Sequence, residues 1–356
     1  MMGGMNVFGS LLSAVKYPLL VLLAGVVLAA MVGGPGEAVL VAVLAVLEIS
    51  LSFDNAVINA TVLRRLNAFW QRMFMTVGMV IAVVGMRLVF PVVIVAVTAG
   101  LGFGAVIDLI LNHPSEYAVR LADAHPAIAA FGGIFLLMIF LDFLLDEAKR
   151  VHWLAVIEAP LASGGRLKTL SSLLALLALI VVSHTWGAAE SQRVMMAGVT
   201  GLATYLAVRG FSELFEQFGG VRPDGSSAHA AKATVGLAGR AALFLFLYLE
   251  VLDASFSFDG VIGAFAITSN VLTIAIGLGV GAFFVRELTV WLVRHDTLGE
   301  FIYLEHGAHY ALGALAVLMA ASLRYDVPEV ITGLTGAIFI GLAVMSSLQA
   351  RGRRHA

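Results

Sequence analysis

The sequence has no cysteine and few charged residues, and both shortages restrict what the protein can be. Without cysteine, the chain cannot form disulfide bonds, thiolate zinc sites or iron–sulfur clusters. Charged residues make up 12% of its 356 residues, whereas hydrophobic residues make up 60%. Soluble domains carry about 25% charged residues. The charged residues of this chain supply too little polar surface to cover a water-soluble globule. The sequence therefore predicts an all-α, polytopic protein of the lipid bilayer.

An excess of charge of either sign is also missing. The chain has 21 basic and 23 acidic residues, a net charge of −2, and no broad basic tract. This balance offers no electrostatic attraction for nucleic acid, which we exclude as a partner. A phosphate-binding loop of the type Gly-x4-Gly-Lys-Ser/Thr is absent as well, so an ATP-driven pump is not expected.

Long apolar runs recur along the whole chain. A spanning helix needs about 20 mostly apolar residues. The sequence predicts ten of them, centred in residues 17–33, 38–63, 73–97, 127–145, 169–187, 194–211, 241–267, 271–292, 308–322 and 328–347. The apolar stretch 101–111 is too short to span and is predicted to be interfacial or re-entrant. The first run is either an ordinary membrane anchor or a signal peptide, because Lys16 precedes it and small residues end it.

Lysine and arginine in the loops predict the orientation, because they are enriched on the cytoplasmic side. With Met1 inside, only Arg120, Arg193 and Arg324 fall outside. The inner side receives Lys16, Arg64, Arg65, Arg72, Lys149, Arg150, Arg166, Lys168, Arg222, Lys232, Arg294, Arg351, Arg353 and Arg354. We therefore expect a multi-pass protein of the cytoplasmic membrane with both termini in the cytoplasm.

Two segments of the chain resemble each other. The segment that begins at Glu48 matches the one that begins at Asp253, with an identical Ser-x-Ser-Phe-Asp core. Further along, Gly78 and Arg87 correspond to Gly277 and Arg286. Five predicted spans separate the copies, so they enter the membrane from opposite sides, as in the inverted repeats of many secondary transporters. We divide the chain into an N-terminal helix (1–37), repeat 1 (38–146), middle helices with a cytoplasmic loop (147–240), repeat 2 (241–323), and a C-terminal helix with a basic tail (324–356).

Both copies place acids inside apolar runs. Each carboxylate at a helix centre costs about 2.5 to 3.5 kcal/mol on insertion scales, so such groups are functional candidates by default. The alternatives are structural pairing with Arg87, Arg240 or Arg286, or protonation. The candidate ligands or proton carriers are Glu48, Ser52, Asp54 and Asn55 in the first copy, and Glu250, Asp253, Ser257 and Asp259 in the second.

The acids do not fit one face of a straight helix. Asp54 follows Glu48 by six residues, and Asp259 follows Asp253 by six, which is roughly 240° around an α-helix. We therefore predict a break or kink within residues 48–59 and within 250–263, of the kind found in discontinuous transporter helices.

Carboxylate, amide and hydroxyl oxygens suit hard divalent cations such as Mg²⁺, Ca²⁺ or Mn²⁺. Protons could use the same acids, which would couple ion export to proton uptake. The ion would be cargo, so no resident cofactor and no enzyme activity are expected. Arg87 and Arg286 are expected either to neutralise the acids or to snorkel toward an interface.

At these acids the chain resembles the TerC family of integral membrane proteins. The similarity rests on Glu48, Asp54 and Asn55, and on Glu250, Asp253 and Asp259, followed by Thr268-Ser269-Asn270 and Phe301-x-Tyr303-Leu304. It runs from about the second to the ninth predicted helix. The resemblance implies a place in the superfamily of amino-acid and metal exporters, with manganese efflux, metal delivery to exported enzymes or tellurite resistance as associated roles.

The sequence thus favours a secondary transporter that exports a divalent cation, with Mn²⁺ first, and leaves its oligomeric state open. One rival is an exporter of a cationic amino acid or amine. A second is an intramembrane aspartyl protease, although the Gly-x-Gly-Asp signature is missing. A third is a non-transporting component of a metal or tellurite stress-response complex.

Two weaker signals remain near the predicted cytoplasmic ends of helices. His306 and His309 could ligate a metal or simply bond to neighbouring groups. Asp142 and Asp146 could guide ions inward or mark a solvated helix end.

Overall fold

The computed structural model describes residues 2–149, 151–164, 169–218, 239–268, 270–294 and 301–355. Within these ranges all regular structure is helical and no sheet forms, which confirms the predicted all-α class. A helix pairs its backbone N–H and C=O groups within its own segment. An apolar chain in a bilayer requires this pairing, because lipid offers the backbone no hydrogen-bond partners.

The first half of the chain consists of a few long helices followed by several short ones. In order, they are α1 (Met2–Gly33), α2 (Pro35–Leu51), α3 (Phe53–Leu63), α4 (Ala68–Val80), the π-helix η1 (Ile81–Val89), α5 (Phe90–Ala99), α6 (Phe103–Asn112), α7 (Pro114–Asp123) and α8 (His125–Leu144).

The second half begins with a short helix and then contains mostly long ones. They are α9 (Ala155–Gly164), α10 (Leu170–Thr185), the 3₁₀ turn η2 (Ala188–Glu190), α11 (Ser191–Phe218), α12 (Gly239–Ile267), α13 (Val271–Arg294), α15 (Leu304–Ala321) and α16 (Glu329–His355).

Local sequence sets several of these boundaries. Pro35 occupies the first turn of α2, where its missing N–H costs no hydrogen bond. Asn67 caps α4, and its side-chain oxygen accepts from the N–H groups of Phe69 and Trp70, both at 3.1 Å. Gly100 ends α5 with φ 63°, a left-handed conformation that glycine adopts without steric cost. The stretch 101–111 forms the short apolar helix α6, in agreement with its predicted inability to span.

The protein is a multi-pass membrane protein with five or six candidate spans in its described part. Five helices are long and apolar enough to cross a bilayer: Lys16–Gly33, Ala68–Val97, His125–Leu144, Val271–Arg294 and Leu334–Arg351. The sixth candidate is the pair Leu170–Thr185 and Ala188–Gly210, which bends by 96°. This count is smaller than the predicted ten. The second predicted span is broken at Ser52, and α12 and α15 carry acids or histidines along their length.

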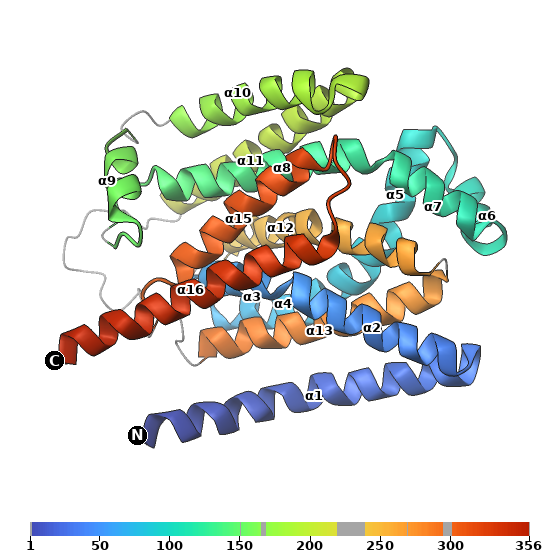
Figure 1. The fold of residues 1–356 in the computed structure, drawn as a ribbon, viewed down its shortest axis with the longest axis horizontal. Helices are drawn as coiled ribbons and strands as arrows, with labels where there is room; N and C mark the ends of the chain where they lie inside the picture. Colours follow the sequence, from blue (N-terminus) through green and yellow to red (C-terminus); the bar gives the residue numbers. More distant parts are fainter. Residues whose placement is uncertain are drawn as a thin grey trace.

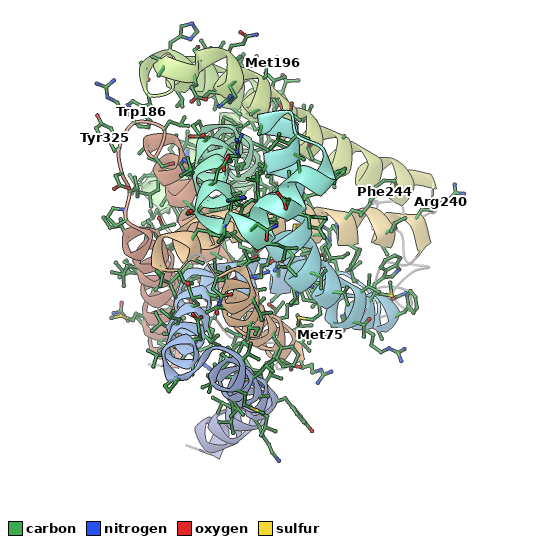
Figure 2. The ribbon with its side chains drawn as sticks, turned by 90° about the vertical axis from the view of Figure 1, so that its right-hand side faces the viewer. Met75, Trp186, Met196, Arg240, Phe244 and Tyr325 are labelled. Carbon is green, nitrogen blue, oxygen red and sulfur yellow. The ribbon has the colours of Figure 1, made fainter. Side chains whose placement is uncertain are left out.

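The long helices lie side by side along the long axis of the molecule, and the chain reverses at each end (Figure 1). Both termini lie at one end, together with α9, whereas α6 and α7 lie at the other end (Figure 1). We call these the terminal end and the far end. At the far end, Arg324 Nη1 donates to Thr185 O at 3.4 Å, and Figure 2 places Trp186 near Tyr325.

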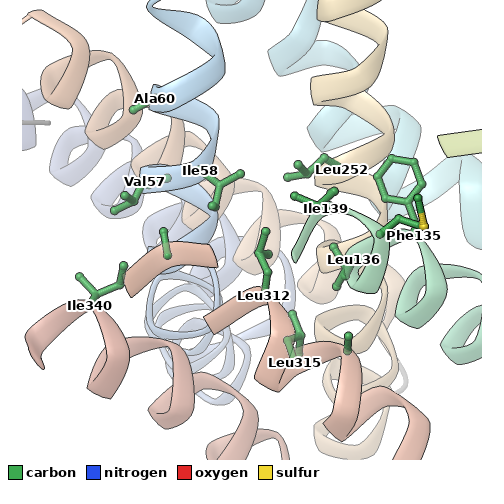
Figure 3. Close-up of a cluster of buried hydrophobic side chains, with 14 of the residues drawn as sticks. Val57, Ile58, Ala60, Phe135, Leu136, Ile139, Leu252, Leu312, Leu315 and Ile340 are labelled. Carbon is green, nitrogen blue, oxygen red and sulfur yellow. The ribbon is translucent and has the colours of Figure 1, made fainter. Parts of the chain in front are cut away.

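A hydrophobic core joins the two halves of the chain. Figure 3 shows side chains of α3, α8, α12, α15 and α16 meeting in one cluster. Ile58, Leu136, Leu252 and Leu312 are each at most 1% exposed. Because these residues are far apart in sequence, this packing fixes the first acidic segment relative to the second.

Glycines let α2 and α13 approach closely. A Cβ atom added at Gly281 would lie 2.5 Å from Glu48 Cβ, and one at Gly277 would lie 2.6 Å from Leu44 Cβ. Both glycines lie on α13, four residues apart, so they form a flat stripe of the small-x3-small kind. The stripe brings α13 directly against the turn of α2 that carries Glu48.

Candidate functional site

The first acidic segment is broken where the sequence predicts a break. α2 ends at Leu51, Ser52 adopts φ −103° and ψ 14°, and α3 begins at Phe53. The interruption is local, because Ser52 N still donates to Glu48 O at 3.0 Å.

The predicted break in the second segment is wrong, because α12 is helical throughout from Gly239 to Ile267. Glu250 and Asp253 are three residues apart, so they share one helix face and both reach Arg286 without any unwinding.

Glu48 is buried and paired with an arginine. Its side chain is 2% exposed, forms an ion pair with Arg87 Nη2, and accepts a hydrogen bond from Ser52 Oγ at 3.1 Å. Arg87 lies in η1, and its Nη1 also donates to Ala82 O in the same π-helix. π-Helical turns are rare and often occur at functional sites. Here the turn carries the guanidinium that neutralises Glu48.

The second segment has a matching arrangement around Arg286. Arg286 Nη2 lies 3.2 Å from Glu250 Oε2 and 3.4 Å from Asp253 Oδ2. Its Nη1 donates to Phe74 O at 2.9 Å, and its guanidinium carbon lies 4.2 Å from the centre of the Phe74 ring. Gly78 leaves room for this group, because a Cβ there would overlap Arg286 Nη1 and lie 2.6 Å from Glu250 Oε1.

The two segments meet directly. Asn55 Nδ2 donates to Asp253 Oδ1 at 2.9 Å, which links α3 to α12. A Cβ at Gly260 would lie 3.0 Å from Glu48 Oε2, so α12 also reaches the acid of α2. Ser257 is 4% exposed. Of the predicted site residues, the structure thus brings Glu48, Ser52, Asn55, Glu250 and Asp253 into linked contacts, whereas the side chains of Asp54 and Asp259 lie outside the described residues.

The internal repeat has a structural counterpart. The sequence comparison equates Glu48 with Asp253 and Arg87 with Arg286, and each of these acids pairs with the equivalent arginine. Arg87 and Arg286 are 4% and 2% exposed. Burial at this depth excludes snorkelling for both guanidiniums and confirms that they neutralise the acids.

The described side chains of this centre carry three carboxylates and two guanidiniums, which leaves one negative charge in excess. The sequence left two alternatives for these acids, metal ligation and pairing with arginine. In this structure the acids are paired with arginine. Among the described residues, no three His, Asp or Glu side chains are arranged to hold a metal ion. In this structure guanidiniums occupy the positions beside these carboxylates that a bound cation would take.

Two features of the centre carry no signal that we could interpret in the sequence. The π-helix η1 is apolar apart from Arg87, and nothing in its composition separates it from the flanking α-helices. The close approach of Gly78 to Arg286 and Glu250 could not be predicted from the sequence, because it depends on α4 packing beside α12. The pairing of Gly78 with Gly277 in the repeat comparison was the available hint.

His306 and His309 bond to neighbouring backbone, as one of the two sequence interpretations expected. His306 Nε2 lies 2.8 Å from Val151 O, and His309 Nδ1 lies 2.7 Å from Glu305 O. The His309 ring also stacks on Phe143, with ring centres 3.9 Å apart.

Asp142 and Asp146, one helical turn apart, differ in their surroundings. Asp142 pairs with Arg209 and accepts from Tyr205 Oη at 2.6 Å. Asp146 is exposed and accepts from Ala148 N at 2.9 Å, as at an ordinary helix end.

The comparisons correct the resemblance to the TerC family. A family model described as "Protein of unknown function (DUF475)" matches residues 53–355. The match begins after Glu48, so the glutamate of the Glu-x5-Asp-Asn element lies outside it, whereas Asp54 and Asn55 lie inside it. Short runs of buried acids follow from shared chemistry on apolar helices and do not specify a family. No curated protein and no solved structure matches the chain. The chain belongs to this family of proteins of unknown function, DUF475.

Proposed function

We propose that the protein is a secondary transporter that exports a hard divalent cation across the cytoplasmic membrane, with Mn²⁺ as the first ion to test. One observation carries the proposal: Glu48, Glu250 and Asp253 are buried where two repeated segments meet, and each is paired with an arginine. Intramembrane acids that face a helix interface mark ion pathways by default. Oxygen ligands favour Mg²⁺, Ca²⁺ and Mn²⁺ over thiol-seeking metals.

The ion pairs suggest how a cation could bind and leave. A buried carboxylate without a counter-charge is costly, so a guanidinium holds it whenever no cation is bound. An entering divalent cation takes the place of Arg87 and Arg286 at the carboxylates. When it leaves, the arginines return. The site therefore keeps nearly the same charge in both states, which lowers the barrier for release.

We further propose ten crossings in place of the five or six candidates found by length and apolarity. The additional crossings are α2 with α3, α12, α15, and α10 and α11 as separate spans. Their support is the alternating path of the long helices and the placement of both termini at one end (Figure 1). The repeats then have inverted orientation, because α2 and α12 cross in opposite directions.

Protons are the proposed coupling ion. An acid that releases a cation can rebind a proton before its arginine returns. Mn²⁺ efflux from vesicles should then be accelerated by a proton gradient directed against it, and a proton-conducting uncoupler should remove the acceleration.

The test is flux in vesicles that contain the purified protein. Mn²⁺, Ca²⁺, Mg²⁺ and Zn²⁺ are compared for wild type, Glu48→Gln and Asp253→Asn. Both substitutions remove a charge at nearly constant volume, so we expect Mn²⁺ flux to fall at least about tenfold, the loss of roughly 1.4 kcal/mol of transition-state stabilisation.

Glu116→Gln is the control, because Glu116 is an exposed acid that pairs with Arg120 on the surface of α7. It should transport like wild type. Thermal unfolding of each variant separates loss of transport from loss of fold. Equal flux in folded wild type, Glu48→Gln and Asp253→Asn would contradict the proposal.

An organic cation is the second candidate cargo. A cavity of about 360 Å³ lies between η1, α8, α11 and α12, and Glu250 is the only ionisable residue in its lining. The surface that this lining exposes is apolar, so the cavity fits the apolar body of such a cargo, and the charged end would have to reach the Glu250 carboxylate beyond the cavity wall. Competition of a cationic amino acid or amine against Mn²⁺ flux distinguishes the two cargoes. The stress-response scaffold, in contrast, predicts no flux at all.

A further inference from the structure

An apolar cavity lies between three helices near the far end of the molecule. Its volume is about 240 Å³, and its walls are formed by α8, α10 and α15. Among the described residues that line it, none is ionisable, and the indole N–H of Trp186 is the only polar side-chain group. The cavity shares no lining residue with the buried acidic centre or with the cavity beside Glu250. It is therefore a separate feature with a different chemistry.

Small residues create this space, and it opens on the outside of the bundle. Five of the lining residues are alanine and one is glycine. Gly133 of α8 faces α15, because a Cβ there would lie 3.4 Å from Met319 Cβ. Ala129 and Leu179 are each 1% exposed, whereas Val317 is 57% exposed. The cavity is thus a groove with a buried floor and an exposed rim.

The groove is about as long as one leaflet of a bilayer is deep. Its lining runs from Ala129 to Leu137 on α8 and from Ala178 to Trp186 on α10, eight positions in each case. At 1.5 Å per residue this is about 12 Å, and half of a hydrocarbon core of about 30 Å is about 15 Å. α8 is a candidate span that begins at the far end (Figure 1). The groove therefore extends from the far surface to near the middle of the bilayer.

A positive charge lies at the far end of the groove. Leu323 and Trp186 complete the lining there. Arg324 follows Leu323, and its Nη1 donates to O of Thr185, the neighbour of Trp186, at 3.4 Å. A guanidinium has five N–H donors, so further donors remain for a ligand. Tryptophan and tyrosine favour the level of the lipid headgroups, and Figure 2 places Trp186 near Tyr325.

Arg324 differs from the other two basic residues that the sequence assigns to this side of the membrane. Arg120 and Arg193 each pair with an acid three or four residues away, at 2.7 Å. In the part of the chain that the structure describes, no acid forms an ion pair with Arg324, and this includes the exposed Asp326 two residues further on. Because basic residues are rare on the outer side of membrane proteins, an exposed arginine without an acidic partner beside an apolar groove indicates an anionic ligand.

We propose that this groove binds one acyl chain of an anionic phospholipid, whose phosphate is held by Arg324. The apolar walls accept the chain and exclude charged groups. The guanidinium matches a phosphate, which it can bind through two parallel hydrogen bonds. Both parts of the site lie where a lipid places them, with the chain along the helices and the phosphate at the far surface. The inference does not depend on the proposed transport.

Native mass spectrometry of the full-length protein in neutral detergent tests the headgroup contact. The probes are palmitoyl-oleoyl phosphatidylglycerol and the corresponding phosphatidylcholine, whose choline carries a positive charge. We expect wild type to retain one phosphatidylglycerol in preference to phosphatidylcholine. Arg324→Gln should weaken phosphatidylglycerol binding about tenfold, through loss of a charge-assisted hydrogen bond, and should abolish the preference. Arg120→Gln removes the same charge at the same end, outside the groove lining, and should bind like wild type.

A second pair of variants tests the chain contact. Ala178→Phe fills the groove from α10 and should weaken the binding of both lipids about tenfold, because both carry the same chains. Val181→Phe is the control, since Val181 is exposed on the same helix and lies outside the lining. Ala320→Leu fills the groove from α15 and should act like Ala178→Phe. Thermal unfolding of each variant separates lost binding from lost fold. If both filling variants unfold, the headgroup preference decides.

Three results would overturn the proposal. The first is equal retention of the two lipids by wild type, or an unchanged preference in Arg324→Gln. The second is displacement of phosphatidylglycerol by an equal concentration of inorganic phosphate, which would assign Arg324 to a free anion. The third is a dimer in lipid-free detergent that Ala178→Phe converts to a monomer, which would show that a second copy of the chain covers the groove.

Discussion

At the scale of single residues, the two buried arginines determine what the acids can do. Arg286 contacts Glu250, Asp253 and Phe74, and Arg87 contacts Glu48 and Ala82. The sequence predicted which acids and arginines lie inside apolar runs and which are equivalent in the repeat, because charge inside an apolar run is conspicuous. It left arginine pairing as one alternative and did not say which acid each arginine meets, because Arg87 and Glu48 are 39 residues apart and are brought together by α13, which packs against both η1 and α2.

Replacement of Arg286 by methionine tests the counter-charge role. The Arg286→Met change leaves two buried acids uncompensated, and we expect the free energy of unfolding to fall by about 3 to 5 kcal/mol. MnCl₂ should restore part of this loss, because a bound cation supplies the missing charge. The measurement is thermal unfolding in detergent with and without Mn²⁺. Arg120→Met, in an exposed pair, should change stability by less than about 1 kcal/mol. A Mn²⁺-induced rise in Tm no larger than in wild type would contradict the role.

At the scale of helices, close contacts place the acids. α13 lies against α2 because Gly277 and Gly281 carry no side chain. Gly281→Ala would place a Cβ 2.5 Å from Glu48 Cβ and 3.1 Å from Ala45 O, so α2 must move. We expect a loss of about 1 to 3 kcal/mol from overpacking. Thermal unfolding measures it.

Gly341 of α16 is the matched control for this substitution, because a Cβ there meets nothing within 4 Å. Gly341→Ala should leave stability unchanged or raise it by about 0.4 to 1 kcal/mol. Equal effects at Gly281 and Gly341 would show that the α2–α13 contact is looser than the distances indicate.

A second helical contact lies outside the spans, where α9 docks on α15. Glu158 is fully buried, lies 2.8 Å from Lys149 Nζ, and accepts from Leu154 N at 3.0 Å and Tyr310 Oη at 3.2 Å. Burial acts to raise the pKa of Glu158, but the Lys149 and Leu154 hydrogen bonds and the Lys149 charge outweigh it, so the pKa lies below its ordinary value of 4.5.

Because the folded pKa is depressed, Glu158 contributes stability that is present above about pH 4.5 and is lost as pH falls through the folded pKa. Glu158→Gln should therefore lower stability at pH 7 and flatten the acid limb of a Tm-against-pH curve. Glu147→Gln, at an exposed position in the same segment, should follow the wild-type curve. If Tm falls equally steeply with decreasing pH in Glu158→Gln and in wild type, Glu158 does not contribute the acid-dependent stability.

At the scale of the whole molecule, the number of crossings decides which ends share a compartment. Ten crossings place Glu147 on the same face as Arg351 and place Tyr325 opposite. Six crossings that omit α2 with α3, α12 and α15 place Glu147 and Arg351 on opposite faces.

Single cysteines at these positions distinguish ten crossings from six, because the wild-type chain has none. In sealed vesicles of one orientation, an impermeant maleimide should label Glu147→Cys and Arg351→Cys from one face and Tyr325→Cys from the other. All three wild-type residues are exposed. Labelling of Glu147→Cys and Arg351→Cys from opposite faces would refute the ten-crossing path.

The sequence by itself determined the class of the protein: 60% hydrophobic residues and 12% charged residues exclude a soluble globule, and only helices satisfy the backbone in lipid without a closed barrel. It also located the acids, their repeat and the break at Ser52, since charge and local periodicity are read within one segment. Tertiary structure alone decided that α12 stays unbroken and that arginines neutralise Glu48, Glu250 and Asp253. It alone decided that Asn55 joins Asp253. These outcomes depend on contacts between residues up to 198 positions apart, and helical periodicity carries no information about which helix packs beside which.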